Sequence, residues 1–142
     1  MRVSTTIVQR RGLPSRRRRV CRPGRSRHTY PEVRIVALEP ASTAIISGGN
    51  AGSHDVEGIG IGFVPPLLDA ELYDEVRGID EKEARRTVRL LAQEEGIFAG
   101  TSSGLNVVGA LQLAEELGEG KTVVTVAVDT GLKYLATDLF PV

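Results

Sequence analysis

The feature that most limits how this chain can fold is an abrupt change of charge near residue 30. Residues 1–30 contain ten arginines and no acidic residue, and residues 16–19 are all arginine. Residues 31–142 contain eight basic and eighteen acidic residues, so the net charge of zero combines two oppositely charged parts. A basic segment interrupted by Pro and Gly has little apolar surface to bury, and we expect residues 1–30 to be disordered.

The rest of the chain, residues 31–142, is long enough for one ordinary domain. A β-rich run at 33–38 and a longer apolar run at 121–128 predict buried strands, and shorter extended pieces are expected at 76–79 and 97–99. Helical patterns lie between these runs. The alternation of strands and helices predicts an α/β domain with a mainly parallel sheet.

Two helices have clear start and stop signals. The first begins at Asp80, which forms a capping-box pattern with Glu83, and it ends before Gly96. The second follows Gly100 and continues to Gly118. A short final helix is expected after the turn at residues 129–131.

The thiol and imidazole content excludes several kinds of site. Cys21 is the only cysteine, so no intrachain disulfide is possible, and His28 and His54 cannot form a metal site by themselves. No apolar run approaches the roughly 18–20 residues that span a bilayer, and the N-terminus lacks the apolar core of a secretory signal. We therefore expect no metal, no membrane and a cytoplasmic location.

Two polar or glycine-rich segments are not needed by strands or helices. Gly58, Gly60 and Gly62 alternate with other residues, which favours either a tight backbone crossing within the fold or a close approach of the main chain to a flat ligand. Ser102 and Ser103 stand at the predicted start of a helix. Serines there are most often caps, but one cap is enough, so the second hydroxyl is free to contact a ligand.

These segments resemble signatures of one enzyme family, the cysteine synthases and cystathionine β-synthases of the β-family of pyridoxal-phosphate enzymes. Four matches occur in the family's order between about residues 31 and 140: Ser47 to Gly49 with His54, then EGIGIGFVP at 57–65, EGIFAGTSSG at 95–104 and DTGLKYL at 129–135. The resemblance implies an incomplete three-layer α/β sandwich, the C-terminal part of the family's larger domain. Residues 31–142 would form this part.

The resemblance also implies roles for individual residues. The equivalent of Ser102 offers its hydroxyl to the pyridine nitrogen of pyridoxal phosphate, and a neutral hydroxyl leaves that nitrogen largely unprotonated. Gly58 and Gly60 correspond to backbone that lines the cofactor and substrate. Asp129 and Thr130 match a turn near the cofactor, where we expect a structural role.

Three parts of the family site have no match in this chain. They are the lysine that bonds the cofactor, the loop that holds the substrate carboxylate and the glycine-rich phosphate loop, and all three precede the matched region in the family. Lys82, Lys121 and Lys133 are the only lysines, and we expect all three to be solvated surface residues. Residues 11–16 stand where the phosphate loop is expected and lack its glycine-rich pattern. No catalytic residue is therefore assigned.

The implied parent enzyme makes L-cysteine from O-acetylserine and sulfide, as a homodimer acting on small amino-acid substrates. A cystathionine β-synthase-like reaction with homocysteine is the alternative within the family. The chain alone is expected to be inactive, to bind the cofactor weakly or not at all, and to be poorly soluble, because missing strands leave a sheet edge and apolar faces uncovered.

Residues 1–30 match nothing in the family. An arginine-rich segment without acids is typical of GC-rich coding DNA translated in the wrong frame, which favours a frameshifted or truncated gene product. Two other interpretations are an organellar transit peptide and a nucleic-acid-binding arm. With such an arm, the α/β domain would be a non-catalytic binding module.

Overall fold

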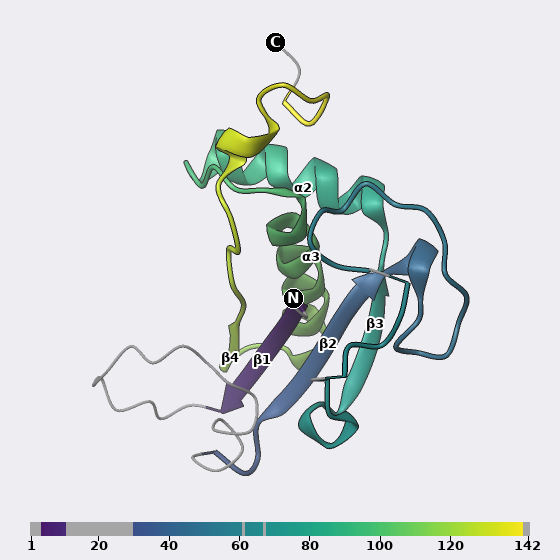
Figure 1. Ribbon diagram of the computed structural model, residues 1–142. Helices are drawn as coiled ribbons and strands as arrows, with labels where there is room; N and C mark the ends of the chain where they lie inside the picture. Colours follow the sequence, from purple (N-terminus) through teal and green to yellow (C-terminus); the bar gives the residue numbers. More distant parts are fainter. Residues whose placement is uncertain (1–3, 11–29, 61, 67, 141–142) are drawn as a thin grey trace.

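The computed structural model describes residues 4–10, 30–60, 62–66 and 68–140 (Figure 1). In this part of the chain, four strands form one sheet in the order β3-β2-β1-β4. The strands are β1 (Ser4–Arg10), β2 (Arg34–Pro40), β3 (Glu75–Ile79) and β4 (Lys121–Val124). The helices are α2 (Glu81–Glu94) and α3 (Thr101–Leu117), with short 3-10 turns η1 (Ala41–Thr43), η2 (Ala70–Leu72) and η3 (Gly131–Tyr134).

The sheet has three strands in one direction and one in the other. β2 pairs with β3 in parallel, whereas β1 is antiparallel to both β2 and β4. β2, β3 and β4 therefore share one direction, as expected for an α/β domain with a mainly parallel sheet. The exception is β1, which comes from the arginine-rich segment.

The expectation that residues 1–30 are disordered is wrong for residues 4–10. β1 pairs on both sides, and Ile7 lies opposite Ile35 in β2 and opposite Val124 in β4. Residues 5–8 are two threonines, an isoleucine and a valine, β-branched types that favour strands. The composition of the whole segment concealed this short run. Residues 11–29 lie outside the described residues, and a domain boundary between residues 30 and 31 stays a prediction.

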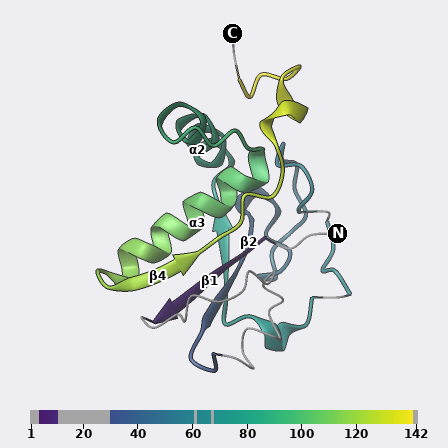
Figure 2. The same cartoon turned by 90° about the vertical axis from the view of Figure 1, so that its left-hand side faces the viewer.

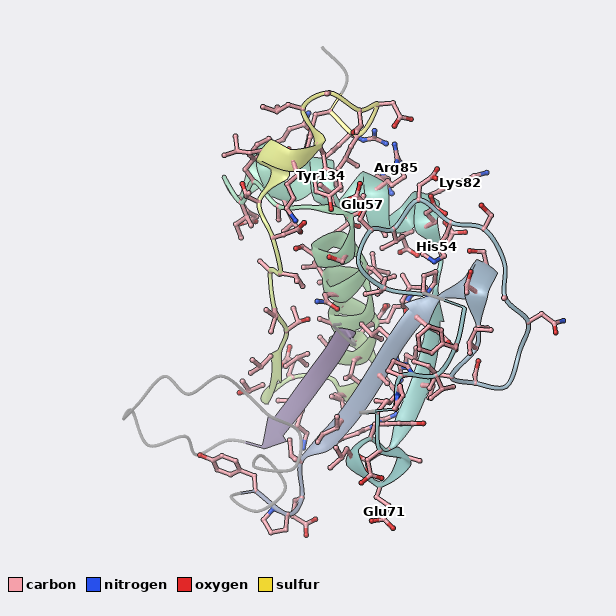
Figure 3. The ribbon with its side chains drawn as sticks, viewed as in Figure 1. His54, Glu57, Glu71, Lys82, Arg85 and Tyr134 are labelled. Carbon is pink, nitrogen blue, oxygen red and sulfur yellow. The ribbon has the colours of Figure 1, made fainter. Side chains whose placement is uncertain are left out.

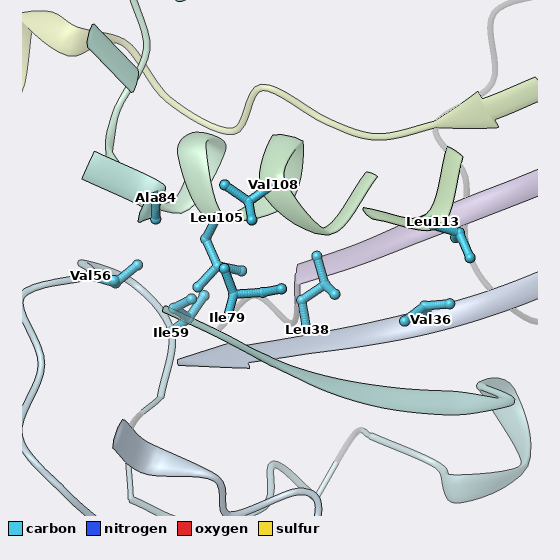
Figure 4. Close-up of a cluster of buried hydrophobic side chains, with 9 residues drawn as sticks. All are labelled: Val36, Leu38, Val56, Ile59, Ile79, Ala84, Leu105, Val108 and Leu113. Atoms are coloured by element: carbon cyan, nitrogen blue, oxygen red, sulfur yellow. The ribbon is translucent and has the colours of Figure 1, made fainter. Parts of the chain in front are cut away.

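α3 lies against one face of the sheet and carries the centre of the core. Figure 4 shows the buried cluster, in which Leu105, Val108 and Leu113 of α3 meet Val36 and Leu38 of β2. Each such side chain contributes about 1.5–3 kcal/mol when it leaves water. Gly109 allows this close approach, since an added Cβ would lie 2.6 Å from the Leu38 side chain.

α2 begins and ends where the sequence predicts. The Asp80 side chain accepts a hydrogen bond from the Glu83 amide at 3.0 Å, and Gly96 follows the helix with a φ of 65°. α2 then crosses α3, where Gly104 faces the Ala84 carbonyl so closely that a Cβ would collide with it. This crossing places the start of α3 beside the start of α2 (Figure 1).

The second face of the sheet is covered by irregular chain, so the described residues show no second helical layer. Ile35 is buried there with Val33 and is packed by Tyr30 and Tyr73. The buried Glu39 carboxylate accepts hydrogen bonds from the Ile46 amide (2.7 Å), and from the Ser47 amide (3.1 Å) and hydroxyl (2.6 Å). Glu39 thus fastens the loop that follows η1 to the end of β2.

Three of the predicted elements differ from those observed. The predicted strand at 97–99 is a single bridge between Ala99 and Thr130, the predicted strand at 121–128 ends at Val124, and the final helix is the 3-10 turn η3. After Val124 the chain also bonds to α3, with the side-chain amide of Asn106 donating to the Val126 carbonyl at 2.9 Å.

Apolar side chains remain uncovered along β4 and around η3. Leu111 of α3 is 61% exposed, Val126 beyond β4 is 54% exposed, and Leu132 in η3 is 64% exposed. Figure 2 shows α3 and β4 side by side at this edge of the sheet. The described residues include no helix that combines the length and apolar character needed to cross a membrane.

Candidate functional site

Three segments that are distant in sequence meet where α3 begins. They are the loop at residues 54–60, the turn at 100–103 and the segment at 129–134 (Figure 3). Main-chain bonds join two of them, because the Gly100 amide donates to the Asp129 carbonyl at 3.3 Å. β2 and β3 end on the same side of the sheet, and ligands of α/β folds bind beyond the carboxyl ends of the parallel strands.

The three hydroxyls in the first turn of α3 have different surroundings. Thr101 Oγ1 accepts from the Glu57 amide at 3.2 Å, and Ser103 Oγ accepts from the Val128 amide at 2.8 Å. Ser102 is 4% exposed, and within the described residues no hydrogen bond reaches its hydroxyl. The outer two hydroxyls therefore hold neighbouring segments, and the middle one is left for another partner.

The expectation that a serine caps this helix is wrong. The N-cap position is Gly100, and no side chain forms a cap hydrogen bond there. Ser102 and Ser103 lie inside the first turn, two and three positions after the N-cap, where their side chains do not cap the free amides of the helix start.

Asp129 is a site residue for which the sequence predicted only a structural role. Its Oδ2 accepts from the Tyr134 hydroxyl at 3.0 Å and lies 3.4 Å from the Lys133 ammonium, which are structural contacts. Its Oδ1 is buried and has no hydrogen-bond partner among the described residues. A Cβ on Gly100 would collide with this oxygen and with the Tyr134 ring, so the glycine makes room for both.

Tyr134 serves this site as a hydrogen-bond donor. Burial raises the pKa of its phenol to about 12; a hydrogen bond with Thr101 opposes this shift and the hydrogen bond to Asp129 adds to it. The hydroxyl therefore keeps its proton throughout the neutral range. It holds the Asp129 carboxylate in one orientation.

His54 explains one of the alternating glycines. Its Nδ1 accepts from the Val56 amide at 3.2 Å, so Nε2 carries the proton and donates to the Gly60 carbonyl at 2.9 Å. A Cβ on Gly60 would collide with the imidazole ring, and Gly60 has a φ of 63°. The sequence favoured either a tight backbone crossing or a close approach to a flat ligand, and the surroundings of Gly60 fit the tight crossing. The sequence placed His54 near this loop but did not reveal the contact.

Gly58 has the opposite surroundings. Its φ of 83° requires glycine, but an added Cβ would have nothing within 4 Å. Because Glu57 is bonded to Thr101, this open backbone lies beside the first turn of α3. Gly62 has the same open surroundings and a φ of 82°, so Gly60 is the one of the three alternating glycines that packs against a side chain.

The described residues fit one end of a pyridoxal ring and not the whole cofactor. No described residue bonds the Ser102 hydroxyl, and the backbone at Gly58 is open. The lysines do not complete the site: Lys82 and Lys121 are exposed, and Lys133 is 61% exposed and paired with Asp129. All three lysines lie at the surface, as the sequence predicts.

The chain belongs to the family of pyridoxal-phosphate dependent enzymes, which its residues 24–129 match. The match begins before the predicted boundary at residue 31 and includes Gly58, Gly60 and Ser102. It also includes β2, β3 and β4 together with both helices.

Relatives within the family are cysteine synthases. The chain is 46% identical over 111 residues to the cysteine synthase of Staphylococcus aureus strain N315, a match that covers 78% of this chain and 36% of that protein. It is 41% identical over 111 residues to a probable cysteine synthase of Bacillus subtilis. The chain therefore spans about a third of the length of the curated relatives it matches.

Solved structures lead to the same family. Cysteine synthase from Entamoeba histolytica superposes with a TM-score of 0.80 and 34% identity, over 83% of this chain and 35% of that one. An O-acetylserine-dependent cystathionine β-synthase from Helicobacter pylori superposes with a TM-score of 0.73 and 34% identity, over 81% of this chain and 37% of that one. These similarities confirm the predicted family and the incomplete α/β fold.

Proposed function

We propose that this chain is the C-terminal part of a cysteine-synthase-like enzyme that makes L-cysteine from O-acetylserine and sulfide, and that it is inactive alone. The observation that carries the proposal is the Ser102 hydroxyl, for which no hydrogen bond is found among the described residues, in a buried residue between two hydroxyls that hold structure. The similarity to cysteine synthases supports it.

In the complete enzyme, pyridoxal phosphate would supply an electron-withdrawing ring that stabilises negative charge on the substrate. Ser102 would bind the ring nitrogen through a neutral hydroxyl, which suits elimination and replacement at the substrate's β-carbon. Gly58 would let the main chain approach the ring. Gly60 would act with His54 to hold that loop in place, and the complete enzyme would be a homodimer.

A second candidate differs only in the nucleophile. The Helicobacter pylori protein that superposes on this chain is named an O-acetylserine-dependent cystathionine β-synthase. Its similarity favours homocysteine as an alternative to sulfide. Both reactions would use the same contacts at Ser102 and Gly58.

A chimera tests the proposal without relying on assembly of two chains. Residues 31–140 would replace the matched part of the Staphylococcus aureus cysteine synthase. We expect the chimera to bind pyridoxal phosphate and to release L-cysteine from O-acetylserine and sulfide. Supplying homocysteine in place of sulfide separates the two candidates, and a folded chimera that does not bind the cofactor would contradict the proposal.

Variants of Ser102 test its proposed contact with the ring nitrogen. In the chimera, Ser102→Ala should retain the visible absorbance of the lysine-bound cofactor and lower kcat on the order of 100-fold, because a preorganised polar contact to the ring is lost. Ser102→Thr keeps a hydroxyl and is the matched control, with a smaller loss. Unchanged kcat in Ser102→Ala would contradict the assigned role.

A further inference from the structure

The loop at residues 54–60 and the segment at 129–134 are joined to the start of α3 by different kinds of contact. The segment at 129–134 is joined by main chain, because the Gly100 amide donates to a carbonyl of that segment at 3.3 Å. The loop is joined through a side chain, since the Glu57 amide donates to Thr101 Oγ1 at 3.2 Å. The position of the loop relative to α3 therefore depends on how one hydroxyl is oriented.

Tyr134 orients that hydroxyl. Burial raises the pKa of the Tyr134 phenol to about 12, a hydrogen bond with Thr101 opposes this shift, and a hydrogen bond with Asp129 adds to it. These directions are those of a phenol oxygen that accepts from the Thr101 hydroxyl and donates to the Asp129 carboxylate. A hydroxyl has one proton and two lone pairs, so Thr101 directs its proton at Tyr134 and keeps a lone pair for the Glu57 amide.

Four groups therefore form one chain of hydrogen bonds with a single direction, which we call the Glu57–Asp129 chain. The Glu57 amide donates to the Thr101 hydroxyl, and this hydroxyl donates to Tyr134. Tyr134 in turn donates to Asp129 Oδ2 at 3.0 Å. An ionised carboxylate only accepts, so Asp129 ends the chain with a charge-assisted bond. Thr101 and Tyr134 are buried, and Figure 3 shows where Glu57 and Tyr134 lie at this end of the molecule.

The Glu57–Asp129 chain also bears on the two predicted cofactor contacts. Gly58 directly follows Glu57, and Ser102 directly follows Thr101. The hydrogen bond between Glu57 and Thr101 therefore controls how far the open backbone at Gly58 lies from Ser102. A space whose width is fixed in advance favours binding, because it does not have to be ordered when the ligand enters.

We propose that Thr101 and Tyr134, anchored by Asp129, are positioning residues that hold Gly58 at a fixed distance from Ser102, so that one flat ring can reach both. They act through the main chain of the loop and not by contact with the ring. The identity of the ring rests on the proposed function. The holding of the loop does not, and it can be measured without a cofactor.

The first test uses the full chain without cofactor. Thr101→Val keeps the shape of the side chain but removes the hydroxyl, and we expect hydrogen exchange at the Glu57 amide to become about tenfold faster. Tyr134→Phe leaves the hydroxyl without its orienting partner, and a several-fold acceleration is expected. Thr101→Ser keeps the hydroxyl and should restore exchange to within about twofold of the parent. Ser103→Ala is the matched control, because the hydroxyl it removes from the same turn holds Val128 and not Glu57.

The second test measures cofactor binding in the chimera that contains residues 31–140. We expect Thr101→Val and Tyr134→Phe to weaken the binding of pyridoxal phosphate about tenfold, and Thr101→Ser to bind it as the parent does. Titration of the visible absorbance of the bound cofactor measures this affinity. A folded parent chimera that does not bind the cofactor would contradict the proposed function, and the exchange rates at Glu57 would then decide the inference by themselves.

Three results would overturn the inference. Unchanged exchange at Glu57 in Thr101→Val would show that this hydroxyl does not hold the loop. Equal acceleration at Glu57 in Ser103→Ala would show that any damage to the turn loosens the loop. In a chimera that binds the cofactor, equal affinities in Thr101→Val and Thr101→Ser would show that the Glu57–Asp129 chain does not position the cofactor contacts.

Discussion

The two ends of α3 differ in how their polar groups are satisfied. At the C-terminal end, Glu116 pairs with Arg34 of β2 and Arg77 of β3, and Glu75 pairs with the same two arginines. Each of these four groups has two partners of opposite charge. At the N-terminal end, a serine hydroxyl and a buried carboxylate oxygen have no partner among the described residues.

This contrast separates a structural cluster from a binding site. A closed ring of ion pairs ties two strands to a helix and leaves nothing for a ligand. A buried polar atom without a partner costs free energy, and in native proteins such atoms are few and usually have a specific reason. Asp129 Oδ1 is such an atom, which makes the start of α3 the candidate binding end of this helix.

Crowding the N-terminal end should have the largest effect. Gly100→Ala adds a Cβ that collides with Asp129 Oδ1 and the Tyr134 ring, and we expect the free energy of unfolding to fall by about 2–3 kcal/mol. Urea titration measures it. Gly78→Ala is the matched control, because its Cβ would lie 3.3 Å from Ala41 Cα and can be accommodated by a small shift. Equal losses in both variants would show that Gly100 is not specially constrained.

Removing a structural hydroxyl at the same end should have the next largest effect. Ser103→Ala removes the acceptor of the Val128 amide, and we expect a loss of about 1–2 kcal/mol in the free energy of unfolding. Hydrogen exchange should also become faster at Val128. A variant as stable as the parent would mean that Ser103 does not hold this segment.

Breaking the ion pairs at the C-terminal end of α3 should have a smaller effect on the free energy of unfolding, and this effect should depend on pH. The hydrogen bond from Arg77 lowers the pKa of Glu75, burial opposes this shift and Arg34 adds to it. A lowered pKa stabilises the fold fully above the ordinary glutamate value of about 4.3, and this stabilisation is lost as pH falls through the lower value.

Glu75→Gln should therefore cost about 1 kcal/mol at neutral pH and reduce the loss of stability on acidification. Urea titrations at a series of pH values measure both effects. The control is Glu119→Gln, because Glu119 is exposed and forms no ion pair in the described part of the chain. If the free energy of unfolding changed with pH in the same way in the parent and in Glu75→Gln, the ion pairs of Glu75 would not contribute the predicted stability.

The smallest effect on stability is expected at the residue proposed to bind the cofactor. Ser102→Ala removes a hydroxyl that no described group uses, so the free energy of unfolding should change by less than about 0.5 kcal/mol. The same urea titration compares it with Ser103→Ala. A loss as large as that of Ser103→Ala would show that Ser102 is structural and would remove the contrast between the two ends.

Helix caps and glycines in the sequence predicted where α2 and α3 begin and where α2 ends. The side chain of Asp80 caps α2, Gly96 follows that helix, and α3 begins directly after Gly100, because caps and glycines act on neighbouring residues. β1 and the pairing of residues 97–99 and 125–128 were not predictable in this way. Their structure depends on which distant segment lies beside them.

The site was predictable only in part. The motif indicated Ser102 and Gly58, and their contact with a cofactor stays a prediction. The reason that Gly60 is a glycine depends on where the loop places the His54 ring, and the free oxygen of Asp129 depends on Tyr134. The spacing of residues along the chain does not predict how close two side chains come in space. The six-residue spacing of His54 and Gly60 is the one sequence signal that could have suggested their contact.

The place of β1 has a consequence for the order in which the chain folds during synthesis. β1 leaves the ribosome before β2, and its other partner β4 follows only after more than one hundred further residues. β1 can pair early with β2, but its other side must wait until Lys121–Val124 has emerged. Such late, long-range pairing slows folding and keeps a strand edge open to other chains in the meantime. A nascent polypeptide that contains this sequence would therefore present an unpaired edge of β1 until β4 emerges.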